Sequence, residues 1–405
     1  MTLFGKVKVT RWGYSGRGTS SVFPLEEKLN LPGDGYSYGI HERVGEAVAR
    51  SAFDVAVKEI DRHTGGHVPK RQAEELSRKL AIDFNRFYEE KSEKVVSPDA
   101  LLVISTDGKG IPMRVDDLRP VTRKAAQSEN HKLKTRLSKG EKRFRKRMAL
   151  VAAVYDVKPH QRKADEIMAL DQSQRKPAPK PFNKRVWASI EEETKTVLDQ
   201  AFEEAKRHDP GRERQWLILV DGLEEQLRQV NQAMKRHGAE KAVVIQDFIH
   251  VLEYVWKAAR CLYPEGSTRA EIWVCHHALS ILEGKLDRVI TGMCCNAEHL
   301  SEKEREPIDK CVDYLLKNKE RMNYALALEK GWPIATGVIE GACRYLVKDR
   351  MECTGARWSL AGAEAVLRLR ALQASNDWDA YMIFHLQQER IRNRYSMPLD
   401  EKMAA

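Results

Sequence analysis

Three short apolar runs in this chain each stop at an aspartate. The run LLVIST ends at Asp107, WLILV ends at Asp221 and AVVIQ ends at Asp247. Runs of this length, rich in Val, Ile and Leu, are typical of buried strands. An acid that ends such a strand lies at the C-terminal edge of the sheet, where ligands gather in open α/β folds. The chain is therefore expected to bring several carboxylates to one edge of a sheet.

Strand patterns alternate with helix patterns, which predicts an α/β fold with a mixed sheet flanked by helices. Residues 99–115 are expected to form a hairpin whose turn is Gly-Lys-Gly at 108–110. Residues 148–157 form a long apolar run typical of a buried central strand. A short strand pattern, KVKVTRWGY, occurs near the N-terminus. A helix is expected over residues 186–208.

Helical spacing dominates the rest of the chain and suggests its division into regions. We expect a mainly helical N-terminal region, a sheet-containing core interrupted by a basic segment, a large all-helical insertion, a helical end of the core and a short tail. Their boundaries are 1–95, 96–247 with the basic segment 122–147, 248–330, 331–395 and 396–405.

The charge balance favours a polyanionic partner. The 405 residues include 69 Lys and Arg against 59 Asp and Glu, which gives a net charge of +10. Such a balance is typical of proteins that bind nucleic acid or an anionic surface. The chain has no run of 18 apolar residues to span a bilayer and no apolar signal core, so a cytoplasmic location without membrane contact is expected. The seven cysteines form no regular ladder and indicate reduced thiols.

Carboxylates gathered at one sheet edge repel each other, and a divalent cation removes that cost. Two unit charges about 4 Å apart cost roughly 4 kcal/mol at an effective dielectric constant near 20. Mg²⁺ prefers hard oxygen ligands and keeps coordination positions open for phosphate oxygens. Two such ions can activate a nucleophile and stabilise the leaving oxygen in a displacement at phosphorus.

A further carboxylate is expected from the segment 335–359, read as a helix that Thr336-Gly337 opens. Glu340 lies in its first turn, and Arg344 and Lys348 follow at four-residue intervals on the same face. A carboxylate backed by two cations suits a site that holds metal and clamps a phosphodiester. Ordinary ion pairing along a solvated helix explains the same spacing equally well.

The blocks STDGKGIPMR, KRMALVAAVY, QDFIHVLEYVWKAA and IEGACRYLVKDRMECTGARW occur in this order. Together with Asp107, Asp221 and Glu340 they resemble the DDE transposases of bacterial insertion sequences, in particular the ISKra type, which is related to the Mutator-like group. The resemblance extends from about residue 20 to 395. It implies an RNase H-like core that uses two Mg²⁺ (or Mn²⁺) ions to cut and rejoin DNA, with those three acids as the catalytic metal ligands.

Asp247 and His250 form an Asp-x-x-His pattern that resembles a signature of several transposase groups. Asp247 can cap the following helix, contact DNA together with His250, or ligate metal. We favour the cap with DNA contact, although the choice between Asp221 and Asp247 as second metal ligand stays open at this stage.

Basic and aromatic residues supply further candidates for DNA contact. The stretch 123–147 has eleven Lys and Arg against two Glu, which suggests an arm that grips phosphates. The candidates are Lys142, Arg143, Arg145, Lys146 and Arg147 in this stretch, Arg344 and Lys348 beside Glu340, and Arg357 and Trp358 after it. A zinc site is not expected, because Cys295 and His299 lack a paired-cysteine knuckle.

The resemblance implies a transposase that cleaves and joins DNA at the ends of an insertion sequence. Its core is expected to be catalytic, and its N-terminal region is a possible site of DNA-end recognition. Its expected partner is double-stranded DNA, at element ends and target, and its expected state a homodimer or higher on DNA in the bacterial nucleoid. Two alternatives are an RNase H-like nuclease that only hydrolyses, and a transposase-derived DNA-binding protein without catalysis.

Overall fold

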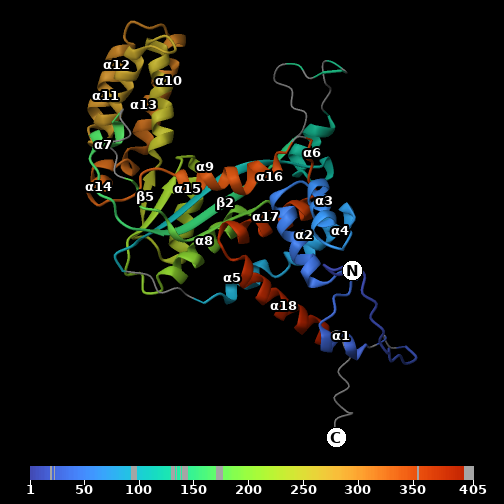
Figure 1. Cartoon of the computed structure of the whole chain (residues 1–405). Helices are drawn as coiled ribbons and strands as arrows, with labels where there is room; N and C mark the ends of the chain where they lie inside the picture. Colours follow the sequence, from blue (N-terminus) through green and yellow to red (C-terminus); the bar gives the residue numbers. More distant parts are fainter. Residues whose placement is uncertain are drawn as a thin grey trace.

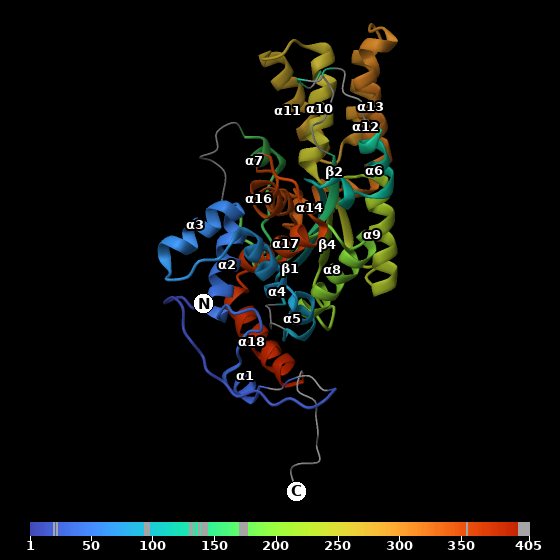
Figure 2. The ribbon, with the colours of Figure 1, turned by 90° about the vertical axis from the view of Figure 1, so that its right-hand side faces the viewer.

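A five-stranded mixed sheet lies between two layers of helices in the computed structural model (Figures 1 and 2). The structure describes residues 1–18, 21, 23–92, 98–128, 133, 135–136, 138, 145–169, 177–353 and 355–395. The strands are β1 (Leu101–Pro112), β2 (Lys146–Val157), β3 (Phe182–Ser189), β4 (Trp216–Val220) and β5 (Val243–Gln246). The predicted α/β class with a mixed sheet flanked by helices is therefore confirmed.

The order of strands across the sheet is β3-β2-β1-β4-β5. β1, β2 and β3 pair in antiparallel fashion, whereas β4 pairs in parallel with β1 and β5 in parallel with β4. The first six residues of β1, the last seven of β2 and all five of β4 are buried. This burial explains their continuous apolar runs, since both faces of these strands are covered.

A cluster of helices precedes the sheet. It consists of α1 (Pro24–Leu29), α2 (Tyr38–Arg50), α3 (Phe53–His63), α4 (Lys70–Leu80) and α5 (Phe84–Glu90). The helical pattern predicted for this region is confirmed. The strand predicted from KVKVTRWGY is wrong, because residues 6–13 form no strand.

The remaining helices outside the insertion follow β1, and several of them contact the strands of the sheet. They are α6 (Pro120–Gln127), α7 (Ala164–Met168), α8 (Thr194–His208), α9 (Glu224–His237), α15 (Gly337–Ala342), a π-helical segment (Cys343–Lys348), α16 (Asp349–Met351), α17 (Leu360–Ala374) and α18 (Trp378–Tyr395). Figure 2 shows α8 and α9 on one side of β1 and β4, and α16 and α17 on the other. A short 3-10 turn, Val115–Asp117, follows β1.

The segment between β5 and α15, which was expected to be a helical insertion, is mainly helical. It contains α10 (Phe248–Leu262), α11 (Thr268–Leu282), α12 (Leu286–Ala297), α13 (Glu302–Asn318), a 3-10 turn (Lys319–Arg321) and α14 (Tyr324–Glu329). Figure 1 shows α10 to α13 standing away from the sheet as a bundle. No helix within the described ranges is long and apolar enough to cross a membrane.

The hairpin predicted for 99–115 is wrong. β1 continues through Gly108 and Gly110 to Pro112, and it pairs with β2 along its whole length. Neither glycine has the positive φ that a tight turn would require. A Cβ at Gly110 would lie 2.9 Å from Lys146 Cδ, so the glycine serves close packing between strands rather than a turn.

The helix predicted over 186–208 begins too early. Residues 182–189 form β3, and the helix α8 starts only at Thr194. Polar and cationic residues at the start of β3 hide its strand pattern, and the buried Val186 and Trp187 also suit the first turn of a helix. The side chain of Trp187 instead donates to Gln200 on α8 at 3.1 Å, which ties this strand to the helix.

Candidate functional site

The three aspartates fall on one line across the sheet. Continuing the β1–β4 register of Ser105 opposite Leu219 by two residues brings Asp107 level with Asp221. Continuing the register of β4 and β5 by one residue brings Asp221 level with Asp247. Neighbouring strands are about 4.8 Å apart, so the three acids stand side by side. We call these three residues the aspartate row.

Asp107 lies within β1 rather than at its end, because the strand continues beyond it. Its carboxylate is half-buried, and Oδ2 accepts a hydrogen bond from Cys343 Sγ at 3.2 Å. Burial, together with the charge of Asp107, raises the pKa of the Cys343 thiol. The thiol therefore stays protonated and acts as a donor to the carboxylate.

Asp221 follows β4 and is held by the start of α9. Its backbone N–H donates to Gln226 Oε1 at 3.3 Å, and Gln226 Nε2 donates to the carbonyl of Thr106 at 2.7 Å. Gln226 thus ties the residue after β4 to the middle of β1. The next residue, Gly222, has φ +90°, and a Cβ there would lie 2.7 Å from the Gln246 side chain. Only glycine fits this bend.

The carboxylate of Asp221 is half-buried and sparsely bonded. Burial raises its pKa, and the neighbouring charge of Asp107 acts in the same direction, against a lowering effect of His250. Oδ1 accepts from Leu223 N at 3.2 Å. Oδ2 has no hydrogen-bond donor among the described residues. This oxygen is therefore available to a cation.

Asp247 is fully buried and nearly saturated with donors. Oδ1 accepts from Ile249 N at 2.9 Å, while Oδ2 accepts from His250 Nδ1 at 2.8 Å and from the hydroxyl of Thr336. The first contact is the predicted N-cap of α10, which is confirmed. Because the carboxylate has no exposed surface, the predicted direct contact of Asp247 with DNA is wrong.

His250 is the exposed partner of this buried acid. The hydrogen bond with Asp247 raises the pKa of His250 to about 9, and the charges of Asp247 and Asp221 add to the effect against partial desolvation. The imidazole is therefore cationic at neutral pH. About a third of its side chain is open to solvent, so it can reach an anion in the site.

Glu340 comes from α15, which lies far along the chain from β1, β4 and β5. It is exposed on the short helix α15, and the Thr336 hydroxyl lies 3.2 Å from its Oε1. One ligand atom from each of Asp247, His250 and Glu340 lies within 4.8 Å of the other two. The structure therefore brings the predicted Glu340 to Asp247, the member of the aspartate row next to β5.

The helix predicted for 335–359 is shorter than expected. α15 begins after Thr336 as predicted but ends at Ala342, and the π-helical segment follows. π-Helical turns often occur at functional sites. Glu340, Arg344 and Lys348 are all exposed, and Arg344 lies 3.9 Å from Asp349. The alternative of simple pairing between Glu340 and Arg344 is not observed within the described residues.

The other candidates for DNA contact have different environments. The predicted contact of Trp358 with DNA is wrong, because this residue is only 6 % exposed. It packs against Arg350 and Phe53, and its indole donates to the Met351 carbonyl. Arg357 is exposed. Of the basic stretch, Lys142 and Arg143 lie outside the described residues, Arg145 and Arg147 are half-buried, and Lys146 pairs with Glu352.

A hydroxyl of the helical insertion reaches the row. Tyr314 on α13 donates to the Asp221 carbonyl at 3.2 Å and accepts from Gln246 Nε2 at 2.7 Å. Its ring stacks on Tyr254 of α10 with centroids 3.9 Å apart. The insertion is therefore bonded directly to the backbone that carries Asp221.

Sequence reasoning missed the supporting residues of the site. Cys343 was detectable in principle, because it follows Glu340 by three residues and so shares its side of the helix. Gln226 and Tyr314 carry no local signal, since their roles arise only when distant elements meet.

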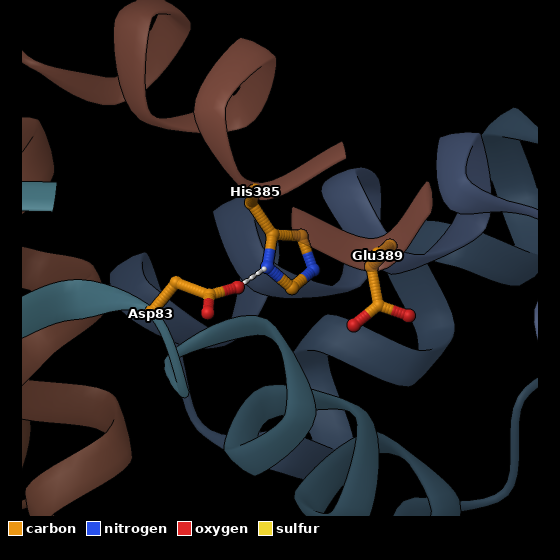
Figure 3. Close-up of side chains that lie close together, drawn as sticks. All are labelled: Asp83, His385 and Glu389. Atoms are coloured by element: carbon orange, nitrogen blue, oxygen red, sulfur yellow. Dashed lines mark hydrogen bonds and ion pairs between the residues drawn. The ribbon is translucent and has the colours of Figure 1, made fainter. Parts of the chain in front are cut away.

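A second group that can hold a metal lies far from the row, in the contact between α18 and the residue before α5. It consists of Asp83, His385 and Glu389 (Figure 3). Arg392 binds both oxygens of Asp83, at 2.8 and 2.6 Å, and His385 donates at 2.7 Å. Burial alone would raise the pKa of Asp83, but these bonds lower it to about 2. The guanidinium already supplies the positive charge that a metal would bring.

Comparison of the chain with protein-family models and with curated proteins finds no match.

Replacing Asp83 by alanine leaves the buried His385 without its partner. We expect a loss of about 3 kcal/mol in the free energy of unfolding at pH 7, measured with urea. Because the folded pKa of Asp83 is lowered, its contribution is present above its ordinary pKa and is lost as the pH falls toward 2. The control Arg86→Ala breaks an exposed pair on α5 and should change stability by less than about 0.5 kcal/mol. If a chelator destabilised the unaltered protein to the same extent, the group would be a metal site instead.

Titration of His250 by NMR tests its pairing with Asp247. The midpoint is expected near pH 9, and Asp247→Asn should move it toward the ordinary value of about 6.5. The raised pKa means that this pair contributes stability fully below about 6.5 and loses the contribution as the pH rises through 9. A midpoint that does not move in the variant would show that Asp247 is not the cause.

Tyr314→Phe removes one hydroxyl and leaves the ring stack intact. We expect a loss of about 1–3 kcal/mol, because the Gln246 amide is left without its partner. Amide hydrogen exchange should become faster around residues 220–223 and remain unchanged in α12. The matched control is Tyr254→Phe, since the Tyr254 hydroxyl makes no hydrogen bond with the described residues. Equal effects of both variants would refute the bond to Asp221.

Proposed function

We propose that this protein is a DDE-type transposase that cleaves DNA and transfers strands with the help of divalent metal ions. The observation that carries the proposal is the alignment of the three aspartates across the sheet, with Glu340 close to Asp247, in a chain of net charge +10. Without a cation the carboxylates would repel each other there, and bound metal ions would remove this cost. The net positive charge of the chain suits a polyanionic substrate.

The sheet supports an RNase H-like core for this enzyme. Three antiparallel strands extended by two parallel strands, with helices on both faces, are the arrangement expected of such a core. The helices α10 to α14 stand between β5 and the Glu340 helix, as expected for a transposase with a helical insertion.

The donor atoms of the site fit Mg²⁺ or Mn²⁺. Asp107, Asp221 and Glu340 offer hard carboxylate oxygens, and the thiol of Cys343 stays protonated and so does not compete as a soft ligand. When bound, two such ions would activate the attacking hydroxyl or water and stabilise the leaving oxygen at phosphorus. His250, cationic at neutral pH, would neutralise a phosphate beside them.

Asp221 is the better second ligand, and Asp247 its support. Every donor that fixes Asp247 would have to be displaced before its buried oxygens could reach an ion. Asp221 in contrast keeps one oxygen without a donor in the described part of the chain. Asp247 then acts through His250 and Thr336, by holding the first in its charged state and the second next to Glu340.

The proposal includes the partners that the resemblance implies. These are double-stranded DNA at the element ends and at the target, and a second copy of the chain, because joining requires two ends to be held together. Strand transfer distinguishes this enzyme from a nuclease that only hydrolyses.

Asp107→Ala should lower Mg²⁺-dependent cleavage of element-end DNA by at least about 100-fold, because it removes a charged ligand from the metal centre. DNA binding in EDTA should be unchanged. The control Asp99→Ala alters an exposed acid ahead of β1 and should cleave normally. Cleavage is read on a labelled duplex, and joining on a target plasmid. Cleavage that survived Asp107→Ala would refute the metal assignment, and DNA binding without any cleavage by the unaltered chain would favour the non-catalytic alternative.

A further inference from the structure

A strongly basic groove lies between α8 and α9. Its volume is about 370 Å³, and four cations line it, namely Arg119 before α6, Lys195 on α8, and Arg228 and Arg236 on α9. Among its described lining residues, Glu193 is the single carboxylate. We call these four cations and the space between them the basic groove. None of them belongs to the candidates that the sequence suggested.

Two of the four cations are not neutralised. The exposed side chains of Arg119 and Lys195 make no ion pair or hydrogen bond with the described residues. Burial lowers the pKa of Arg147 nearby, and the charge of Arg119 acts in the same direction, whereas Glu191, Asp117 and Glu364 act against it.

The other two cations have partners that can be exchanged. Arg228 pairs with Glu225, and Arg236 pairs with Asp199, both at 2.6 Å on the protein surface. Pairs of this kind contribute little to stability, so a phosphate can take over either guanidinium at low cost.

The groove leads away from the aspartate row along α9. Gln226 in the first turn of α9 binds the backbone of both Asp221 and Thr106, so the helix begins at the row. Arg228 and Arg236 lie eight residues apart, which is about 12 Å along the helix. That length spans several phosphates of a duplex, which carries one charge per about 1.7 Å of its axis. Figure 2 shows α8 and α9 side by side on the same face of the sheet.

We propose that the basic groove binds the sugar-phosphate backbone of the duplex that flanks the cleaved bond. This inference rests on the proposed function and adds the path of the DNA over the protein. The lining favours a nucleic acid over an acidic protein, because it is almost wholly polar and lacks the apolar centre of a protein interface. The side chains of Gln229 and Gln232 can donate to phosphate or sugar oxygens.

The test is the salt dependence of DNA binding by the full chain in EDTA. Fluorescence anisotropy with a labelled 30-bp duplex, about three helical turns long, gives Kd between about 50 and 200 mM KCl. For the double variant Arg119→Ala/Lys195→Ala, the log–log slope should fall by about 1.8 and Kd should rise about tenfold. The matched control Lys206→Ala removes a cation near the other end of α8 and should leave both values unchanged.

The outcomes separate this inference from the proposed function. An unchanged slope and Kd in a double variant that unfolds at the same temperature as the parent would overturn the groove, while cleavage by the unaltered chain would still support the enzyme. If the double variant binds DNA more weakly but the unaltered chain never cleaves DNA, the groove is supported and the proposed enzyme is overturned. Binding of polyglutamate or anionic vesicles but not of duplex DNA would overturn both.

Discussion

The parallel pairing of β1, β4 and β5 is the constraint on which the site depends. Because the three strands share one register, their acids arrive at the same height and about one strand spacing apart. At that distance, and at an effective dielectric constant near 20, each neighbouring pair of charges would cost about 3–4 kcal/mol. The structure handles each acid differently. Asp247 is neutralised by His250 and surrounded by hydrogen-bond donors, and Asp107 accepts a hydrogen bond from the Cys343 thiol. Asp221 has a raised pKa, and its Oδ2 accepts no hydrogen bond from the described residues.

This gradation leaves Asp247, at the β5 end of the row, closed to ligands, whereas Asp221, in the middle of the row, keeps an oxygen that can reach a cation. Asp247 is held by the cap of α10 and by Thr336, so the β5 end is rigid. Asp221 lies next to the start of α9, from which the basic groove extends. Tyr314, on α13, donates a hydrogen bond to the backbone carbonyl of Asp221. A tilt of α13 would therefore shift the position of the Asp221 carboxylate. We expect the insertion to influence the geometry of the site by this bond rather than by a long-range effect.

Much of the sheet edge follows from the sequence alone. An apolar run that stops at an acid located Asp221 and Asp247 directly after β4 and β5, whereas β1 continues beyond Asp107. Glu340 was located through the helix expected around it. Sequence reasoning failed where tertiary contacts outweigh local pattern. Gly108 and Gly110 looked like a turn, but β2 pairs across them. β3 was missed because its cationic start hides the strand pattern.

The roles of individual side chains depended even more on contacts between distant elements. Trp358 next to Arg357 looked like a surface pair, yet the indole is buried against α3, some three hundred residues away in the chain. The choice between Asp221 and Asp247 also required the structure, because both end parallel strands and only the count of donors separates them. Gln226 and Tyr314 were undetectable from the sequence, since each bridges two strands by hydrogen bonds between elements that are distant in the chain.

Anomalous diffraction from crystals soaked in Mn²⁺ would test the central claim most directly. The account predicts a peak at about 2.1 Å from carboxylate oxygens of both Asp107 and Asp221, with Glu340 turned toward it. A peak held only by Asp247, His250 and Glu340, with no bond to Asp221, would contradict the account.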